Sequence, residues 1–281
     1  ARRRWLAKHR PERLAWIVGD GAYLDEMRER QAKAAVEDDA FAEFVANQAL
    51  IALERSERIY RGARYKVPRI LPGEVFANAD FRNLIANAAQ QRDRSVQEVL
   101  AQAERYLREM AATQTPFTLE MINALYRSAC RSHHDATIDV DEAQIGRVAE
   151  TMAAYPVIFL ISHKSMLDTM ALSLVLFDAD LPLPLTFGGI NLNKPGLGAL
   201  ARRSGIIFLR RSFQDKEIYK STFRRYIDYL IEKRFSLLWA LEGTRSRTGK
   251  LLPPRFGLFN YVFESIQRTR LYDVTFIPVS V

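Results

Sequence analysis

The sequence predicts an α/β domain over residues 155–281, with a largely parallel sheet flanked by helices, after an all-helical region over residues 1–154. After Pro156, short apolar runs alternate with helical patterns, as they do in strand–helix–strand units. Before Pro156, apolar residues recur at helical spacing and helix-start signals precede several stretches. A hydrophobic content of 48% supports a folded core, and a single cysteine excludes an internal disulfide.

The helix starts of the first region are clearest between residues 95 and 142. Ser95 and Glu98 have the spacing of a capping box, in which each residue accepts a backbone hydrogen bond from the other. Pro116 predicts a further helix, because proline is favoured at the first helical position. Asp139 and Glu142 repeat the capping-box spacing and predict a helix to about residue 154.

The second region predicts five strands with helices between them. The predicted strands are 157–161, 185–187, 206–209, 237–241 and 274–279, and the predicted helices are 168–178, 196–203, 215–234 and 257–267. Ligand sites in parallel sheets lie beyond the carboxyl ends of the strands, so polar residues that follow a strand are candidate site residues. The first residue is not Met and the last five read as a strand, so we expect both ends to be cut from a longer chain.

The net charge of +8 is unevenly distributed. From residue 202 to residue 270 there are 16 Lys and Arg against 6 Asp and Glu, a net of +10. This predicts a basic face for phosphate, anionic lipid or nucleic acid. No apolar run approaches the length of a membrane span. A row of arginines near the N-terminus reads either as a solvated helix face or as a contact with anionic lipid: Arg55, Arg58, Arg61 and Arg64.

His163 and Asp168 follow the first predicted strand. Within one helix, side chains five residues apart point about 140° from each other, but across a turn at a strand end they can meet. The carboxylate could then orient the imidazole and leave its other nitrogen free to accept a proton. The alternative is a solvated histidine beside a helix-capping aspartate.

Basic clusters follow two further strands. Arg210 and Arg211 suit a dianion, since guanidinium groups match phosphate oxygens, although two surface arginines would look the same. Residues 242–250, Glu-Gly-Thr-Arg-Ser-Arg-Thr-Gly-Lys, follow the fourth strand. They predict a phosphate cradle with a glycine for close backbone approach, or else a basic turn, and they do not form a P-loop.

Four sequence blocks in this order resemble those of the glycerolipid acyltransferases. They are His-x-x-x-x-Asp at 163–168, Gly-Ile-Ile-Phe-Leu-Arg-Arg-Ser-Phe at 205–213, the 242–250 block, and Ile-Pro-Val-Ser-Val at 277–281. The second and third blocks are similar to the branch of the large bacterial membrane glycerol-3-phosphate acyltransferases, the mitochondrial enzyme and the dihydroxyacetone-phosphate acyltransferase. The stretch 96–110 is also similar. The sequence departs from the usual pattern at 164–167 and 255–257, which affects the fine substrate contacts.

The resemblance implies transfer of a fatty acyl group from acyl-CoA or acyl-carrier protein to the sn-1 hydroxyl of glycerol 3-phosphate. The product would be lysophosphatidate, in the first step of phospholipid synthesis. His163 would be the general base and Asp168 its orienting partner, because an alcohol needs a base beside it to attack a thioester. The implied phosphate- and glycerol-binding residues are Arg210, Arg211, Glu242, Gly243, Arg245, Ser246 and Arg247.

The same resemblance implies that the acyl donor is the only cofactor-like molecule needed. It also implies that the protein is located on a phospholipid membrane surface. We expect a peripheral or monotopic protein on the cytoplasmic face of the inner membrane, with no nucleic-acid partner. We also expect no metal, because the four histidines have no spacing typical of metal ligands: His9, His133, His134 and His163.

Two alternatives remain open at this point. A dihydroxyacetone-phosphate or lysophosphatidate acyltransferase would differ only in the acceptor. A non-catalytic protein that binds anionic membranes or nucleic acid would also suit the basic last third. That second alternative leaves unexplained why the polar clusters follow the strands.

Overall fold

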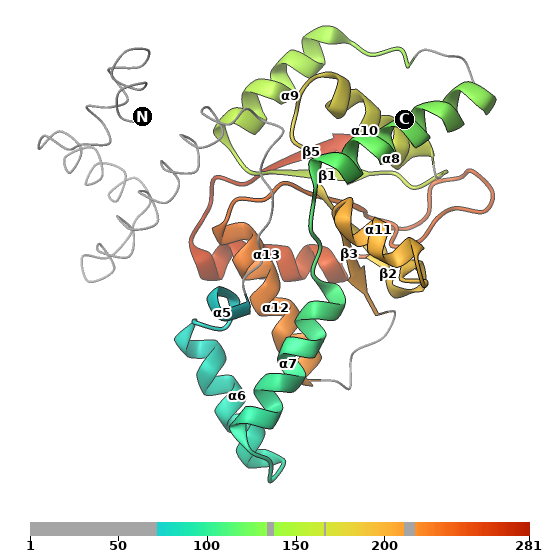
Figure 1. The fold of residues 1–281 in the computed structure, drawn as a ribbon. Coiled ribbons are helices and arrows are strands. Elements are labelled where there is room, and N and C mark those ends of the chain that lie inside the picture. Colours follow the sequence, from blue (N-terminus) through green and yellow to red (C-terminus); the bar gives the residue numbers. More distant parts are fainter. Residues whose placement is uncertain (1–71, 134–137, 166, 211–216) are drawn as a thin grey trace, which may run out of the picture. The chain divides into compact units, whose positions relative to one another are not determined.

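The computed structural model describes residues 72–133, 138–165, 167–210 and 217–281, which belong to a compact unit running from Arg61 to Val281. Its centre is a sheet of five parallel strands in the order β3-β2-β4-β1-β5 (Figure 1). The predicted α/β class with a parallel sheet is confirmed. The strands are β1 (Val157–Ile161), β2 (Leu185–Gly189), β3 (Ile206–Leu209), β4 (Leu237–Ala240) and β5 (Thr275–Val279).

The helices between the strands cover opposite faces of the sheet. From β1 the chain runs through α10 (Leu167–Asp178) and α11 (Leu197–Arg203) to β2 and β3, and it returns through α12 (Glu217–Glu232) and α13 (Gly257–Thr269) to β4 and β5. Parallel crossovers are right-handed, so a reversal of direction moves the helices to the other face. Figure 1 shows α10 on one side of β1 and β5, and α12 and α13 on the other.

This order places a topological switch between β1 and β4. The two strands are hydrogen-bonded neighbours, with Ile161 beside Ala240 at their carboxyl ends. The chain leaves β1 toward α10 and leaves β4 toward α13, so the two loops part to opposite faces. A crevice forms where neighbouring connections diverge in this way, and ligands of open α/β sheets bind there. The carboxyl ends of β1 and β4 are therefore the expected position of a site.

Alternate side chains of the sheet build a separate core on each face. Val157, Phe159 and Ile161 point to one face, where they pack with Leu172 and Leu176 of α10. Helix α9 (Glu142–Ala154) completes this core. Because successive strand residues point to opposite faces, the apolar runs of this sheet are buried on both sides. This double burial is why the sequence shows continuous apolar runs.

Aromatic rings form the core on the opposite face. The Phe187 ring of β2 lies edge-on to Trp239 of β4 and Phe223 of α12, with centroids 5.9 and 6.4 Å away. Phe223 also contacts the Tyr261 ring of α13 at 5.2 Å. Edge-to-face pairs at such distances are favourable beyond the area that they bury. They fix α12 and α13 against the sheet and against each other.

The helices before the sheet are α5 (Pro72–Val75), α6 (Ala79–Gln91), α7 (Val96–Met110), α8 (Pro116–His133) and α9. The predicted capping box at Ser95 is confirmed, and α8 begins at Pro116 as predicted. The predicted start of α9 at Asp139 is wrong. Asp141 is the N-cap, because its carboxylate accepts the backbone N–H groups of the two residues after Glu142.

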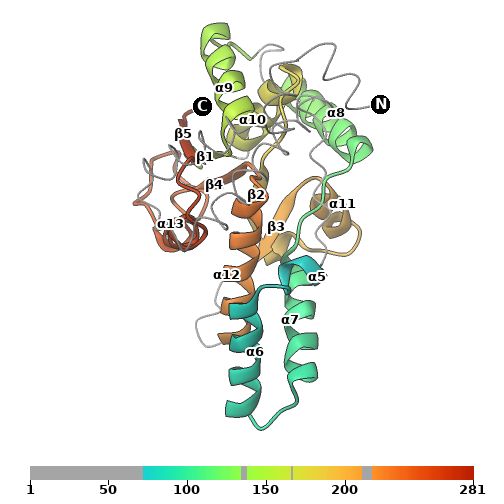
Figure 2. The ribbon, with the colours of Figure 1, turned by 90° about the vertical axis from the view of Figure 1, so that its left-hand side faces the viewer.

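Helix α7 is tied to the sheet region at its C-terminal end. The Arg202 guanidinium donates to three backbone carbonyls at 2.7–3.0 Å, those of Arg108, Glu109 and Ala111. The Tyr226 hydroxyl accepts the Ala112 N–H at 3.2 Å. The Arg202 bonds satisfy carbonyls at the helix end that lack intrahelical partners, and the Tyr226 bond satisfies the backbone N–H that follows. Figure 2 shows α6 and α7 as a hairpin beside α12.

The predicted boundary at 154/155 marks a change in secondary structure, while the compact unit reaches back to Arg61. The first 71 residues lie outside the described part, and so do the helical assignment made for them and the N-terminal arginine row. None of the described helices combines the length and apolar character that crossing a bilayer requires.

Candidate active site

Two hydrogen bonds join the loop after β1 to the loop after β4. The backbone N–H of His163 donates to Glu242 Oε2 at 2.8 Å. The backbone N–H of Ser246 donates to the His163 carbonyl oxygen at 2.9 Å. Three predicted site residues from two strand ends therefore meet at the switch between β1 and β4, where the fold favours a ligand site.

Glu242 and Ser246 are buried, with 5% and 4% of their surface exposed. Both were predicted to position the substrate glycerol. In the structure they form hydrogen bonds with the protein, as buried polar groups need partners. The Ser246 backbone N–H makes the His163 contact, and its Oγ atom accepts the Thr248 N–H at 3.3 Å. Glu242 and Ser246 therefore brace the His163 backbone.

Asp168 lies buried in the first turn of α10 and is bonded to Ser165. Ser165 donates its N–H to Asp168 Oδ2 at 2.8 Å and its hydroxyl to Oδ1 at 3.0 Å. The Leu167 N–H donates to Ser165 Oγ at 3.0 Å. This pattern is similar to a capping box with Asp168 as the acid, except that the Ser165 hydroxyl accepts the N–H of Leu167 and not that of Asp168. The expected bond from Asp168 to the imidazole is not formed, because the helix start engages the carboxylate.

The His163 ring is left without an orienting partner. Its Nδ1 atom is buried and has no hydrogen-bond partner in the described part of the chain, and the same holds for Ser162 Oγ. A buried polar atom without a partner costs about 1–3 kcal/mol. Such an atom calls for a specific explanation in a folded protein, and a ligand or catalytic role is one.

The loop after β4 presents glycine and arginine beside this histidine. Gly243 has φ +65°, a left-handed conformation that favours glycine, and a Cβ there would lie 3.2 Å from Arg255 Cδ. Arg245 and Arg247 are exposed, and neither forms an ion pair with the described residues. Two free guanidinium groups near a histidine suit a phosphate-bearing ligand. No cluster of three metal-ligand side chains occurs within the described ranges.

Comparisons with known proteins identify the same region. Residues 145–281 match a family model described as Acyltransferase. The "Putative acyltransferase plsB1" of Mycobacterium tuberculosis (strain ATCC 25618 / H37Rv) is 36% identical over 188 residues, which are 67% of this chain and 30% of that protein. Residues 145–281 therefore form an acyltransferase domain.

A second relative carries a more specific name. The glycerol-3-phosphate acyltransferase of Pseudomonas fluorescens (strain SBW25) is 32% identical over 198 residues, which are 70% of this chain and 23% of that protein. The chain thus spans less than a third of the length of these two relatives. The acyltransferase match covers the whole sheet, the His163 loop and the loop after β4.

Arg210, predicted to bind phosphate, is engaged elsewhere in this acyltransferase. Its Nε and Nη2 atoms donate to the two carboxylate oxygens of Glu109 in α7, both at 2.5 Å. The guanidinium also lies 5.0 Å from the ring centroids of Tyr106 and Tyr219. The hydrogen bonds to Glu109 raise the pKa of Arg210. A bidentate pair with a carboxylate neutralises the charge that phosphate would need, so Arg210 fastens α7 to the end of β3.

The sheet order also separates Arg210 from His163. β3 and β1 are three strand spacings apart, with β2 and β4 between them. At about 4.8 Å per spacing the strand ends lie roughly 14 Å apart. Arg211, the second predicted arginine, lies outside the described residues. Of the predicted cations, Arg245 and Arg247 are those that flank Ser246, whose backbone is hydrogen-bonded to His163.

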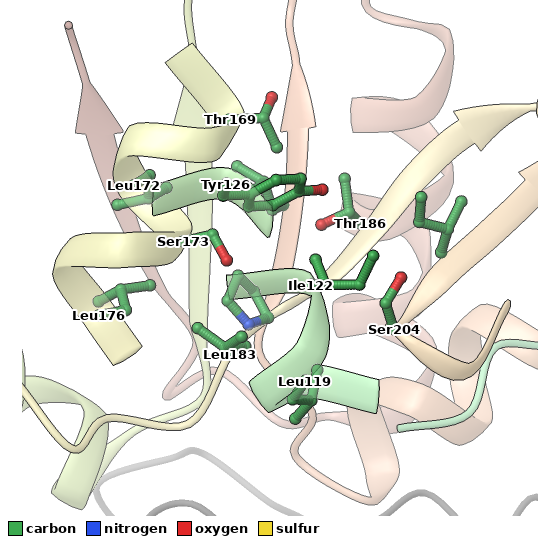
Figure 3. A pocket seen from close by; sticks show the side chains of 13 residues that line it. Leu119, Ile122, Tyr126, Thr169, Leu172, Ser173, Leu176, Leu183, Thr186 and Ser204 are labelled. Carbon is green, nitrogen blue, oxygen red and sulfur yellow. The ribbon is translucent and has the colours of Figure 1, made fainter. Parts of the chain in front are cut away.

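A mainly apolar pocket lies between α8, α10 and the sheet (Figure 3). Thr169, Leu172, Ser173 and Leu176 line it from one face of α10, beginning next to Asp168. Leu119, Ile122 and Tyr126 line it from α8, which lies outside the matched family region. Its volume is about 60 Å³. At roughly 10–15 Å³ of such volume per water-sized group, it holds about four to six methylenes.

Sequence reasoning missed Ser165 and Glu109 as parts of the site and its support. Ser165 had a signal, since Ser165 and Asp168 have capping-box spacing before an apolar run. The sequence carried no signal that pairs Glu109 with Arg210, because the two residues are 101 positions apart. Only the folded chain shows which acid faces which arginine.

We predict that Glu242→Ala lowers the free energy of unfolding by about 1–3 kcal/mol, because the His163 N–H loses its acceptor. Glu242→Gln keeps a side-chain oxygen there and should retain most of the stability. Urea unfolding of both variants measures the difference. Glu150→Ala, at an exposed position on α9, is the control. Equal stability of the Ala and Gln variants would contradict the bracing role.

Proposed function

We propose that this acyltransferase moves a fatty acyl group from acyl-CoA or acyl-carrier protein to the sn-1 hydroxyl of glycerol 3-phosphate, giving lysophosphatidate. The observation that carries the proposal is the position of His163 at the topological switch between β1 and β4, hydrogen-bonded to a loop whose Arg245 and Arg247 form no ion pair with the described residues. The name of the Pseudomonas relative, a glycerol-3-phosphate acyltransferase, supports glycerol 3-phosphate as the acceptor. Dihydroxyacetone phosphate and lysophosphatidate are the alternative acceptors.

In the proposed reaction His163 acts as the general base. Its imidazole takes the proton of the substrate hydroxyl while the hydroxyl oxygen bonds to the thioester carbonyl carbon. The carbon–sulfur bond then breaks, and the departing thiolate takes the proton from the imidazolium. The substrate hydroxyl thus has the place of the serine in a Ser-His-Asp triad. Backbone bonds to Glu242 and Ser246 hold the His163 backbone in position for this attack.

We infer that Asp168 supports the imidazolium by reaching His163 Nδ1 during the reaction. Nδ1 is buried without a partner, and a positive ring there would need an acceptor more strongly than a neutral ring does. The carboxylate has two oxygens, each holding one Ser165 donor, so a small rotation could free one of them. Asp168 would then serve both the helix start and the histidine.

The proposed phosphate site uses Arg245 and Arg247, with Gly243 allowing close backbone approach. Support comes from their exposure, their lack of ion pairs with described residues and the Ser246 bond that anchors the segment to His163. Arg210 contributes indirectly, by holding the end of β3 against α7. The acyl chain would begin at His163 and enter the pocket along the Thr169 face of α10.

Both the acyl chain and the product are lipids, so the protein should work at a phospholipid surface. We propose a peripheral or monotopic place on the cytoplasmic face of the inner membrane. The excess of basic residues in the last third supports attraction to anionic lipid.

His163→Ala should abolish release of free CoA thiol from acyl-CoA in the presence of glycerol 3-phosphate. General-base catalysis is worth about 10²–10⁴ in rate, and the variant loses the base. Wild-type release should depend on glycerol 3-phosphate and fall when lysophosphatidate or dihydroxyacetone phosphate replaces it. Binding of glycerol 3-phosphate, measured by calorimetry, should persist in the variant. Turnover by His163→Ala would refute the base assignment.

Arg245→Ala should raise the KM for glycerol 3-phosphate by about 10- to 150-fold with little change in kcat, the loss of a charge-assisted hydrogen bond worth about 1.5–3 kcal/mol. Arg203→Ala, an exposed arginine in the last turn of α11, is the matched control and should leave KM unchanged. Steady-state kinetics with varied acceptor measure both. An unchanged KM for Arg245→Ala would remove it from the phosphate site.

Ile122→Phe should discriminate against long acyl donors, since the larger side chain fills space between α8 and α10. Losing room for two methylenes, at about 0.8 kcal/mol each, lowers kcat/KM for palmitoyl-CoA roughly tenfold. Butanoyl-CoA, whose two methylenes fit in the space that remains, should be less affected. Leu125→Phe makes a similar enlargement at an exposed position of α8 and is the control. An identical chain-length profile in wild type and Ile122→Phe would place the acyl chain elsewhere.

A further inference from the structure

The segment from the loop after β4 into the first half of α13 carries positively charged residues and no acidic residue. From residue 243 to residue 263 the sequence has no Asp or Glu and four basic residues, Arg245, Arg247, Lys250 and Arg255. All four are exposed. A run of cations with no counter-charge in its own segment produces a local positive field that attracts polyanions.

The same segment exposes large apolar side chains. Leu251, Phe256 and Phe263 are 69%, 55% and 49% exposed. The Phe259 ring lies between two of them, 6.2 Å from Phe256 and 6.3 Å from Phe263. Exposed large apolar side chains that group together mark sites of interaction with proteins or membranes. We call Lys250, Leu251, Arg255, Phe256, Phe259 and Phe263 the loop–α13 surface.

The buried face of α13 accounts for only part of its apolar side chains. Tyr261 contacts Phe223 of α12, and Val262 and Ile266 are buried. Phe259 lies on the same helix face as Ile266, and its ring packs against Phe276 of β5 at 5.5 Å. Phe256 and Phe263 flank Phe259 and are exposed, so the apolar surface of α13 extends beyond the part that packs against α12 and β5.

We propose that the loop–α13 surface docks on a bilayer that contains anionic lipid. Aromatic rings favour the boundary between headgroups and acyl chains, and lysine and arginine favour anionic headgroups. The surface has both chemistries within one segment of the chain. Its charge complements an anionic membrane, and its exposed rings and Leu251 supply the apolar part that a purely electrostatic partner would not need.

This surface adjoins the active site. Ser246 is bonded to the His163 backbone, and the Arg255 N–H donates to the Leu241 carbonyl oxygen at 2.6 Å, which returns the loop to the end of β4. Phe256 then precedes α13 directly. The inference rests on the proposed function, because docking here would bring His163 to the lipid phase into which an acylated product partitions.

The test is sedimentation of the 281-residue chain with phospholipid vesicles, without substrates. Vesicles of equal parts phosphatidylglycerol and phosphatidylcholine are compared with phosphatidylcholine alone. We expect binding to the anionic vesicles that weakens with salt. Lys250→Glu changes the charge by two units, each worth about fivefold, so its affinity should fall roughly 30-fold.

Leu251→Ser combined with Phe263→Ser removes two exposed apolar side chains and should weaken binding by about tenfold or more. Phe117→Ser is the matched control, since Phe117 is 75% exposed at the start of α8, away from this segment. It should bind as the wild type does. Thiol release from octanoyl-CoA in vesicle-free buffer should be retained by the apolar double variant and by Phe117→Ser.

Several results would overturn the proposal. The first is that the wild type does not bind anionic vesicles. The second is that both surface variants bind as tightly as the wild type, and the third is that Phe117→Ser weakens binding as much as they do. Loss in Lys250→Glu with none in the apolar double variant would indicate a purely electrostatic polyanion surface, as for nucleic acid. Vesicle binding needs no turnover, so these results are independent of whether the chain acylates glycerol 3-phosphate.

Discussion

The two hydrogen bonds between the loops after β1 and β4 are the constraint on which the site depends. They hold His163 by its backbone, through Glu242 and Ser246, and leave its buried Nδ1 atom without a hydrogen-bond partner among the described residues. The loops approach because β1 and β4 are neighbours whose connections leave to opposite faces. A histidine fixed by its main chain keeps its ring available for a ligand. The buried Glu242 is thus a structural acid at the centre of the candidate site.

The arginines have two different roles, one in the fold and one in the candidate site. Arg202 and Arg210 bind the carbonyls and the carboxylate of α7, and so attach the preceding helices to the sheet. Arg245 and Arg247 are exposed and form no ion pair within the described part of the chain. A guanidinium matched to a carboxylate stabilises the fold, whereas one without a counter-ion can bind a phosphate. The charge excess of the last third therefore overstates the number of cations available to substrate.

The fold could be predicted closely because strand burial and helix caps are local signals. The runs at 157–161 and 206–209 became β1 and β3 with the predicted bounds, and Pro116 began α8. The site was predicted less completely. His163, Glu242 and Ser246 meet as residues after strand ends should, but Asp168 pairs with Ser165, and Arg210 pairs with Glu109. These partners depend on competition between nearby donors and on contacts across 101 residues.

The sequence by itself determined the parallel α/β class, the family resemblance and the loops that carry the chemistry. Apolar periodicity and motif order are properties of the linear chain, and they need no partner to be read. Only the tertiary structure decided which polar residues brace the site and which face solvent. A carboxylate or guanidinium is satisfied by whichever group the fold brings within about 3 Å, and that group can come from any part of the chain.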